Sequence, residues 1–218
     1  MTNAAKKVNV VIVYGGELAK DIAEQIEALK PTTTTTDDLN FDIDITLRCA
    51  SERPKTLLDY KINTVEEEEG DDDDDVKKKK KDDDADKEEV IPADTTTTTT
   101  TTTIVCFVLQ TIENNSPTES GGTTIRFFKR KTHPSDFLSS NGTTMNYCVF
   151  GCGDSNLLFD RQTTGSKDCN FVAQELDTRL EVLGGVRQCT LGLADERTGL
   201  TEVEPWIRNV FWKSIINN

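Results

Sequence analysis

Residues 146–155 read NYCVFGCGDS, an apolar stretch that runs into a glycine-rich, polar one. Positions 147–150 carry no charge and end at a turn-forming sequence, which is typical of a short strand buried on both faces of a sheet. The following GCGDS at 151–155 predicts a tight turn at the carboxyl end of that strand. A buried strand of this kind favours an α/β fold, in which ligands bind beyond the carboxyl ends of parallel strands.

The same pattern extends in both directions along the chain. Further strands are predicted from apolar runs, and one edge strand from strict alternation, at 8–14, 41–47, 104–109 and 186–191. Helices are predicted from apolar residues at helical spacing at 17–30, around 172–183 and from 203 to 215, with a short helix at 123–131 after a loop at 110–122. In the last helix, Trp206 is expected on the core face, whereas Trp212 is expected on another face, half-buried or open to a partner.

Strands that alternate with helices predict a parallel sheet covered on both faces. We therefore expect an α/β fold with a doubly wound, five-stranded parallel sheet, in the flavodoxin-like order 2-1-3-4-5, forming a three-layer sandwich. The 218 residues suffice for a single domain, 1–218.

A low-complexity insertion at about 63–103 interrupts this domain. Between Val65 and Glu89 lie fifteen acidic and six basic residues, a net charge of −9 out of −14 for the whole chain, and nine threonines follow at 95–103. Such a composition buries too little apolar surface to offset its ordering entropy, so we expect disorder there. The acidic balance argues against a nucleic-acid partner.

Composition also restricts the compartment and the chemistry. No apolar run approaches the length of a membrane span, and the N-terminus lacks the pattern of a signal peptide, so no membrane association is expected. The six cysteines contain no C-x-x-C pair and His133 is the only histidine, which predicts core thiols, no metal site and a cytoplasmic location. No catalytic residues are expected, since neither a G-x-S-x-G elbow nor a P-loop is present.

Four co-linear stretches carry a resemblance to a known family. The YCVFGCGDS of 147–155, the DTRLEVLG of 177–184, the GLAD of 192–195 and the GLTEVEPWI of 199–207 resemble the FMN-binding, flavodoxin-like domain of diflavin reductases. The last two, with TLRCASE at 46–52, are most similar to methionine synthase reductase. Because the chain stops at Asn218, where such FMN domains end, we expect it to lack the FAD and NADPH modules.

The resemblance implies FMN as cofactor, held by three loops. The implied binding residues are Gly15 and Gly16 after the first strand, Thr111 after the third, and Gly151, Gly153, Asp154, Ser155 and Phe159 after the fourth. It also implies an electron-transfer component rather than a complete reductase, with a separate reductase as donor and a cobalamin-dependent methionine synthase-like acceptor as partners.

Two of these loops depart from the family pattern. The first runs from Gly16 directly into Glu17, without the hydroxyl-rich stretch that holds the phosphate, and the second replaces both glycines of T-G-T-G-D-x-P. Two hypotheses therefore remain: an FMN-type electron carrier, or a degenerate flavodoxin fold that no longer binds FMN and serves as a protein-binding or regulatory module.

Overall fold

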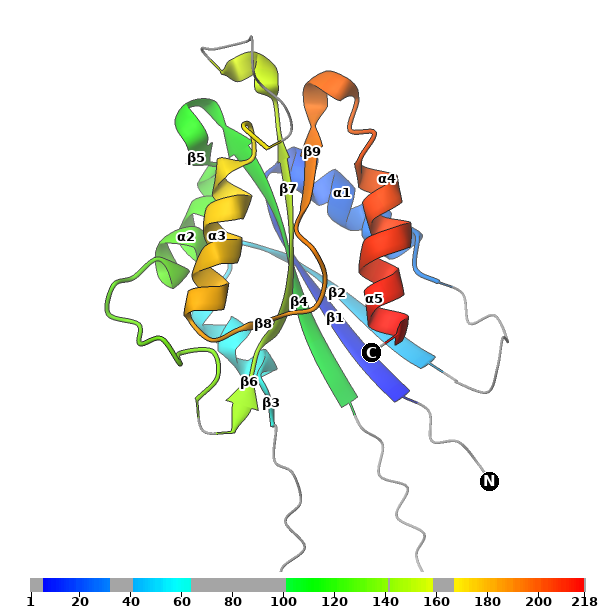
Figure 1. The fold of residues 1–218 in the computed structure, drawn as a ribbon, viewed down its shortest axis with the longest axis vertical. Coiled ribbons are helices and arrows are strands. Elements are labelled where there is room, and N and C mark those ends of the chain that lie inside the picture. The colour runs from blue at the N-terminus through cyan, green and yellow to red at the C-terminus, as the bar shows by residue number, and fades with distance from the viewer. Residues whose placement is uncertain (1–5, 32–40, 64–100, 141, 159–166, 218) are drawn as a thin grey trace, which may run out of the picture.

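A parallel sheet forms the centre of the protein. The computed structural model describes residues 6–31, 41–63, 101–140, 142–158 and 167–217, and the sheet runs in the order β2-β1-β4-β7, with β8 and β9 both paired to β7 (Figure 1). The strands are β1 (Lys6–Gly15), β2 (Phe41–Cys49), β4 (Thr101–Ile112), β7 (Asn146–Gly153), β8 (Val186–Arg187) and β9 (Gly192–Asp195). All of these pairings are parallel. With β8 and β9 counted as one interrupted fifth strand, the predicted order 2-1-3-4-5 is confirmed.

Short antiparallel pairings lie at the two ends of this sheet. At the carboxyl end, β5 (Ser116–Pro117) folds back onto the last residues of β4. At the opposite end, β3 (Ile62–Asn63) pairs with β6 (Thr143–Thr144), and a 3₁₀ helix, Pro54–Tyr60, precedes β3.

Helices cover both faces of the sheet, which confirms the predicted three-layer sandwich. On one face lie α1 (Glu17–Ala28) and a C-terminal helical segment made of α4 (Val203–Trp206), the π-helical turn Ile207–Phe211 and α5 (Trp212–Asn217); on the other lie α2 (Glu119–Phe128) and α3 (Phe171–Val182). The strand side chains alternate between the two layers, as period-2 geometry requires. Val10 and Ile12 of β1 pack under α1, whereas Val11 and Val13 belong to the core beneath α2 and α3.

Element boundaries differ from the sequence-based expectation in three places. The fifth strand, expected at 186–191, is formed only at Val186–Arg187 and resumes beyond the expected end, at Gly192–Asp195. The threonines 101–103 belong to β4 rather than to the insertion, since β4 pairs with β1 from Thr101 onward. The loop expected at 110–122 is shorter, because β4 continues to Ile112 and α2 already begins at Glu119. The Thr118 hydroxyl caps α2 by accepting a hydrogen bond from the Gly121 amide at 3.2 Å. Residues 64–100, most of the predicted insertion, lie outside the described part of the chain.

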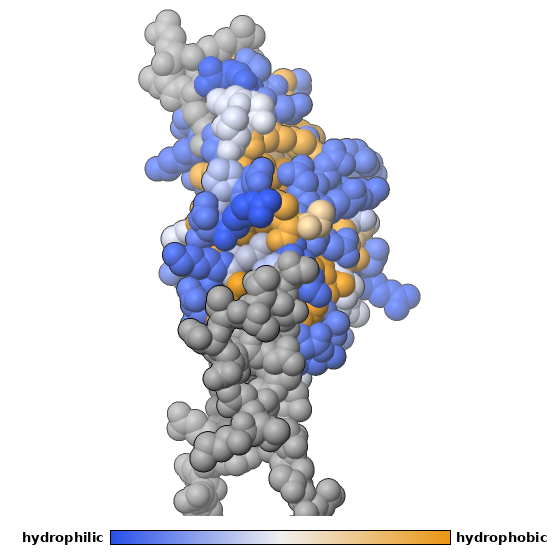
Figure 2. Space-filling model, turned by 90° about the vertical axis from the view of Figure 1, so that its right-hand side faces the viewer, coloured by the Kyte–Doolittle hydropathy of each residue, from blue (hydrophilic) through white to orange (hydrophobic). Residues whose placement is uncertain are grey.

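Both tryptophans of the C-terminal segment are buried, so the expectation of an open or half-buried Trp212 is wrong. Trp206 and Trp212 are 6% and 3% exposed and join the same apolar cluster. The reason is the neighbouring α1, whose C-terminal residues lie beside Trp212 and cover a second side of the helix. The exposed residues of this segment include the charged Glu204, Arg208 and Lys213, and Figure 2 shows this side of the molecule, where hydrophilic and hydrophobic side chains are interspersed. No helix within the described ranges is long and apolar enough to cross a membrane.

Candidate functional site at the carboxyl edge of the sheet

Three connections meet at the carboxyl edge of the sheet, where the family's cofactor loops were expected. They are the turn from β1 into α1, the segment from β4 into α2, and the segment from β7 toward α3. The end of β9 lies beside the third connection, at the upper end of the sheet in Figure 1. The parallel order of β1, β4 and β7 places these connections side by side.

The β1–α1 turn consists of Gly15 and Gly16, and its geometry requires both glycines. A Cβ on Gly15 would lie 2.7 Å from the Gly121 Cα, so β1 and α2 approach each other at backbone distance. Gly16 has a φ of 120°, and a Cβ there would lie 2.8 Å from the Gln110 Cβ and closer still to the Gln110 amide oxygen. The predicted residues therefore lie at the expected edge, but the space around Gly16 is filled by Gln110.

The β4–α2 segment is tied to α3 through Thr111. The buried Thr111 hydroxyl accepts a hydrogen bond from the Val172 amide at 3.3 Å, which satisfies a first-turn amide of α3. The segment then turns through Asn115, whose φ of 56° lies in the left-handed region that asparagine tolerates. Asn115 thus adopts a backbone conformation for which glycine is the usual residue. The Thr111 hydroxyl is buried and bonded to α3, so it is not exposed to a ligand.

Gly151 and Gly153 of β7 make room for the segment that leads into α3. A Cβ on Gly151 would lie 2.6 Å from the Ala173 Cβ, and a Cβ on Gly153 would lie 2.9 Å from the carbonyl carbon of Cys169 and closer still to its oxygen. Both glycines are thus required by packing, whatever else the turn does.

Asp154 and Ser155 shape the turn that follows β7. The Asp154 carboxylate accepts a hydrogen bond from the Asn156 amide at 2.8 Å, and the amide of the buried Ser155 donates to an Asp195 carboxylate oxygen at 3.0 Å. Leu157, in the same turn, is 45% exposed. Phe159, the remaining predicted site residue, lies outside the described residues.

Asp195, at the end of β9, organises this corner and was not predicted as a site residue. One of its carboxylate oxygens accepts hydrogen bonds from the Ser155 amide and, at 3.1 Å, from the Arg197 amide; the other lies 3.7 Å from the Arg197 Nε. The Arg197 Nε also donates to the Ser155 hydroxyl. Burial by itself would raise the pKa of Asp195, but the hydrogen bonds and the Arg197 charge hold that pKa below its ordinary value. The only sequence signal was the aspartate that closes the GLAD stretch.

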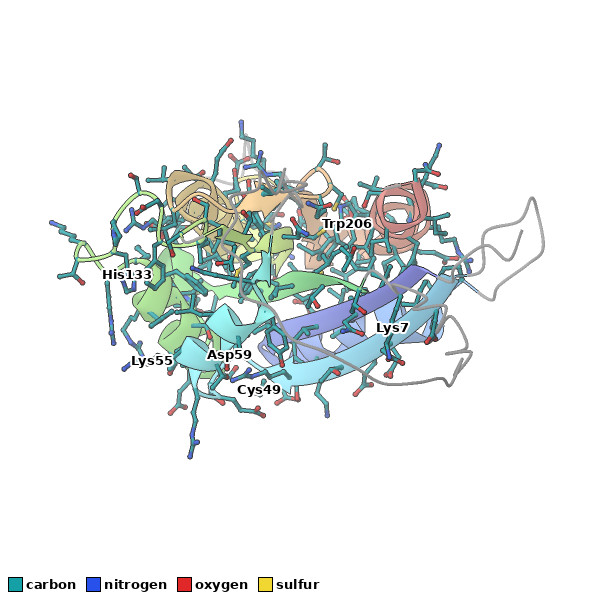
Figure 3. All side chains as sticks on the ribbon, turned by 90° about the horizontal axis from the view of Figure 1, so that it is seen from below. Lys7, Cys49, Lys55, Asp59, His133 and Trp206 are labelled. Carbon is teal, nitrogen blue, oxygen red and sulfur yellow. The ribbon has the colours of Figure 1, made fainter. Side chains whose placement is uncertain are left out.

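The only histidine lies away from this edge. His133 is in the loop after α2, on the opposite side of the molecule from Trp206 (Figure 3). Its ring stacks on Phe137, with centroids 3.9 Å apart, and its Nε2 contacts the Phe127 carbonyl oxygen at 3.0 Å. His133 is therefore part of the packing of this loop.

The first and third connections of this edge differ in how they would meet an FMN phosphate. At the β7 turn, the Ser155 and Asn156 amides already donate to the Asp195 and Asp154 carboxylates, and Leu157 in the same turn is exposed. At the N-terminus of α1, by contrast, Gly16 supplies no capping side chain and Glu17 places a carboxylate in the first turn, where a phosphate would otherwise be favoured. The β1–α1 turn therefore lacks the groups that a phosphate cradle needs.

Comparisons with known proteins agree with this architecture. The family model for flavodoxin matches residues 74–206. The chain is 33% identical over 109 residues to methionine synthase reductase of Bos taurus, across 50% of this chain and 14% of that protein. It is 31% identical over 116 residues to NADPH-dependent diflavin oxidoreductase 1 of Danio rerio, across 52% of this chain and 17% of that protein. The chain thus spans less than a fifth of the length of these relatives. Fold, sheet order and family model together show that this chain belongs to the flavodoxin family and is related to the FMN domains of diflavin reductases.

Proposed function

We propose that this chain is a flavin-binding electron-transfer domain of the diflavin-reductase type. The observation that supports this most directly is the β7 turn, in which Asp195 from the neighbouring strand accepts from the Ser155 amide and Gly153 packs against the Cys169 backbone. A turn fixed from outside its own loop is pre-organised, and pre-organisation lowers the free-energy cost of binding. Bound FMN would supply the redox chemistry, and the chain's own residues would position it.

The phosphate is the part of FMN that this chain recognises least. A phosphate cradle supplies charge-assisted hydrogen bonds, each worth about 1.5–3 kcal/mol. The β1–α1 turn has no hydroxyl between Gly15 and Glu17, and Gln110 packs against Gly16. Loss of two or three such bonds weakens affinity by several powers of ten, since each 1.4 kcal/mol is about tenfold. We therefore expect FMN to bind in the micromolar range or more weakly, with riboflavin binding almost as well.

The electron partners follow from the same proposal. A chain of this kind receives electrons from a reductase that carries the FAD and NADPH chemistry and delivers them to an acceptor. A methionine synthase-like cobalamin protein is the acceptor that we propose, on the basis of the similarity to methionine synthase reductase.

A second candidate function is favoured by the β1–α1 turn alone. If Gln110 and the Glu17 carboxylate exclude the cofactor altogether, the fold serves as a binding or regulatory module without flavin. The two candidates differ in a single measurable property, which is whether the folded protein binds flavin at all.

A fluorescence titration with FMN and with riboflavin, on protein freed of any bound cofactor, distinguishes these candidates. Micromolar binding of both ligands supports the electron-transfer domain. The absence of binding by either ligand favours the module. Nanomolar FMN binding with strong discrimination against riboflavin would show that our account of the β1–α1 turn is wrong.

The Glu17→Gln variant makes the titration more specific. Removal of one negative charge next to a phosphate dianion should improve FMN affinity by about 1 kcal/mol, roughly fivefold, and leave riboflavin affinity unchanged. Glu24→Gln, which removes an exposed charge on the same helix beyond the first turn, is the matched control and should change neither affinity.

A further inference from the structure

The fifth strand of the sheet contains a two-residue bulge. Against β7, the register starts as Asn146 with Val186 and Tyr147 with Arg187, and resumes as Phe150 with Gly192. The four residues 188–191 therefore lie opposite only two residues of β7, Cys148 and Val149. A bulge interrupts the ladder and re-aims side chains, and bulges are over-represented at sheet edges and near functional sites.

The bulge places Cys189 against the apolar cluster to which Cys148 of β7 belongs. The Gln188 amide donates to the Tyr147 carbonyl oxygen at 2.8 Å, which keeps the bulge against β7. Besides burial, the proximity of Cys189 contributes to the raised pKa of the Cys148 thiol. Neighbouring strands lie about 4.8 Å apart, and disulfides join Cα atoms about 4.4–6.8 Å apart, so a cross-link between these two strands is feasible.

The two thiols differ in their access to solvent. Cys148 is fully buried, whereas Cys189 is partly exposed and lines a cavity of about 300 Å³ together with polar groups of α5, among them Lys213 and Ser214. Burial also raises the pKa of the Cys148 thiol well above its usual value, so this thiol is protonated at neutral pH. A small oxidant from solution therefore reaches Cys189 first, with Cys148 placed behind it.

We propose that Cys189 and Cys148 form an oxidisable pair that reacts with hydrogen peroxide, with Cys189 as the oxidised thiol and Cys148 as the resolving thiol. In the first step peroxide transfers one oxygen to the Cys189 sulfur, which gives a sulfenic acid and one water. In the second, the Cys148 sulfur attacks the Cys189 sulfur, and the hydroxyl leaves with the Cys148 proton as a second water. Two thiols are oxidised by two electrons in total and one peroxide is reduced. The disulfide then joins β7 to the fifth strand where the bulge interrupts their hydrogen bonding. This reaction does not require a bound flavin.

Two other cysteines provide internal comparisons. Cys106 is opposite Cys148 in the sheet register and is fully buried, so it is the alternative partner for Cys148. Cys49 is partly exposed like Cys189, but its sulfur contacts the Ser51 hydroxyl at 3.1 Å. Cys49 thus tests whether exposure alone leads to a disulfide.

The experiment treats the whole chain with excess hydrogen peroxide and maps its disulfides by mass spectrometry. Trypsin followed by chymotrypsin cuts after Phe150 and so separates Cys148 from Cys152. We expect the protein to lose the mass of two hydrogen atoms, two of its six thiols to become unreactive under denaturing conditions, and one cross-linked peptide to join Cys148 to Cys189. A dithiol reductant should restore all six.

Three variants assign the roles of the two thiols. Cys148→Ala should halt the reaction at the Cys189 sulfenic acid, which dimedone captures, and Cys189→Ser should abolish the disulfide. Cys49→Ser should behave as the wild-type chain does. Six reactive thiols after treatment, or a cross-link that joins Cys148 to Cys106 or involves Cys49, would overturn the proposal. The wild-type peptide map decides this even if a core variant fails to fold.

Discussion

Replacement of Gly153 by alanine tests whether the β7 turn is as tightly packed as the structure indicates. The added Cβ would lie 2.9 Å from the carbonyl carbon of Cys169 and closer still to its oxygen, whereas ordinary contacts of a Cβ begin at 3.4 Å. The obstacle is backbone, so the segment before α3 must move. Such overpacking costs about 1–3 kcal/mol. The same movement disturbs the 2.8 Å hydrogen bond from the Asn170 side chain to the Ala194 carbonyl oxygen, which is worth about 0.5–1.5 kcal/mol.

The expected loss for Gly153→Ala is therefore about 2–4 kcal/mol. Urea unfolding followed by far-UV circular dichroism measures it. With a slope of about 2 kcal/mol per molar urea, the midpoint should fall by about 1–2 M. The control is Gly199→Asn, because Gly199 has a φ of 74° that asparagine adopts and no atom within 4 Å of an added Cβ. A Gly153→Ala midpoint within about 0.3 M of the wild-type value would refute the packing argument.

Three further predictions concern the insertion, Asp195 and His133. Replacement of residues 64–100 by a short Gly/Ser linker should change the free energy of unfolding by no more than about 1 kcal/mol, because loop-closure entropy depends weakly on length; loss of cooperative thermal unfolding would show that the segment packs on the domain. Asp195→Ala leaves the buried Ser155 amide without its acceptor and should cost about 1–3 kcal/mol in urea unfolding at pH 7. Since the pKa of Asp195 is lowered by folding, this contribution should vanish as the pH falls through that folded-state pKa, below about 3.8, and a difference between the chains that does not shrink in acid would contradict the ion-pair account. Burial, with the nearby Arg130 and Arg179 charges, holds the pKa of His133 below 6.5, so the free energy of unfolding should decline as the pH falls through about 6.5. His133→Phe retains an aromatic ring against Phe137 and should flatten that part of the pH profile, measured by thermal unfolding.

The layers of the fold were predictable from sequence because they depend on local periodicity. Strands of alternating or continuous apolar residues, such as 8–14 and 104–109, and the helical spacing of 17–30 specify which faces are buried. The rule that parallel strands connect through right-handed crossovers then leaves few topologies, and the order 2-1-3-4-5 is the one observed. The position of the candidate site at the carboxyl edge follows from the same rule.

The start of α2 combines a local signal, the Thr118 cap, with a tertiary contact. Glycines 121 and 122 indicate a loop by local propensity, but Gly121 lies inside the helix because Gly15 of β1 approaches it at backbone distance. The burial of Trp212 was decided in the same way, by the position of α1 beside it.

The chemistry of the site depends on contacts between residues that are far apart in the chain. Asp195 holds the turn at Ser155 across 40 residues, and the bulge that brings Cys189 to Cys148 is a change of register between two strands. Neither contact can be recognised from a local stretch of sequence, because the hydrophobic periodicity of a segment shows only which of its sides is buried. Which distant side chain meets that buried side is settled only when the strands pair and the helices pack on them.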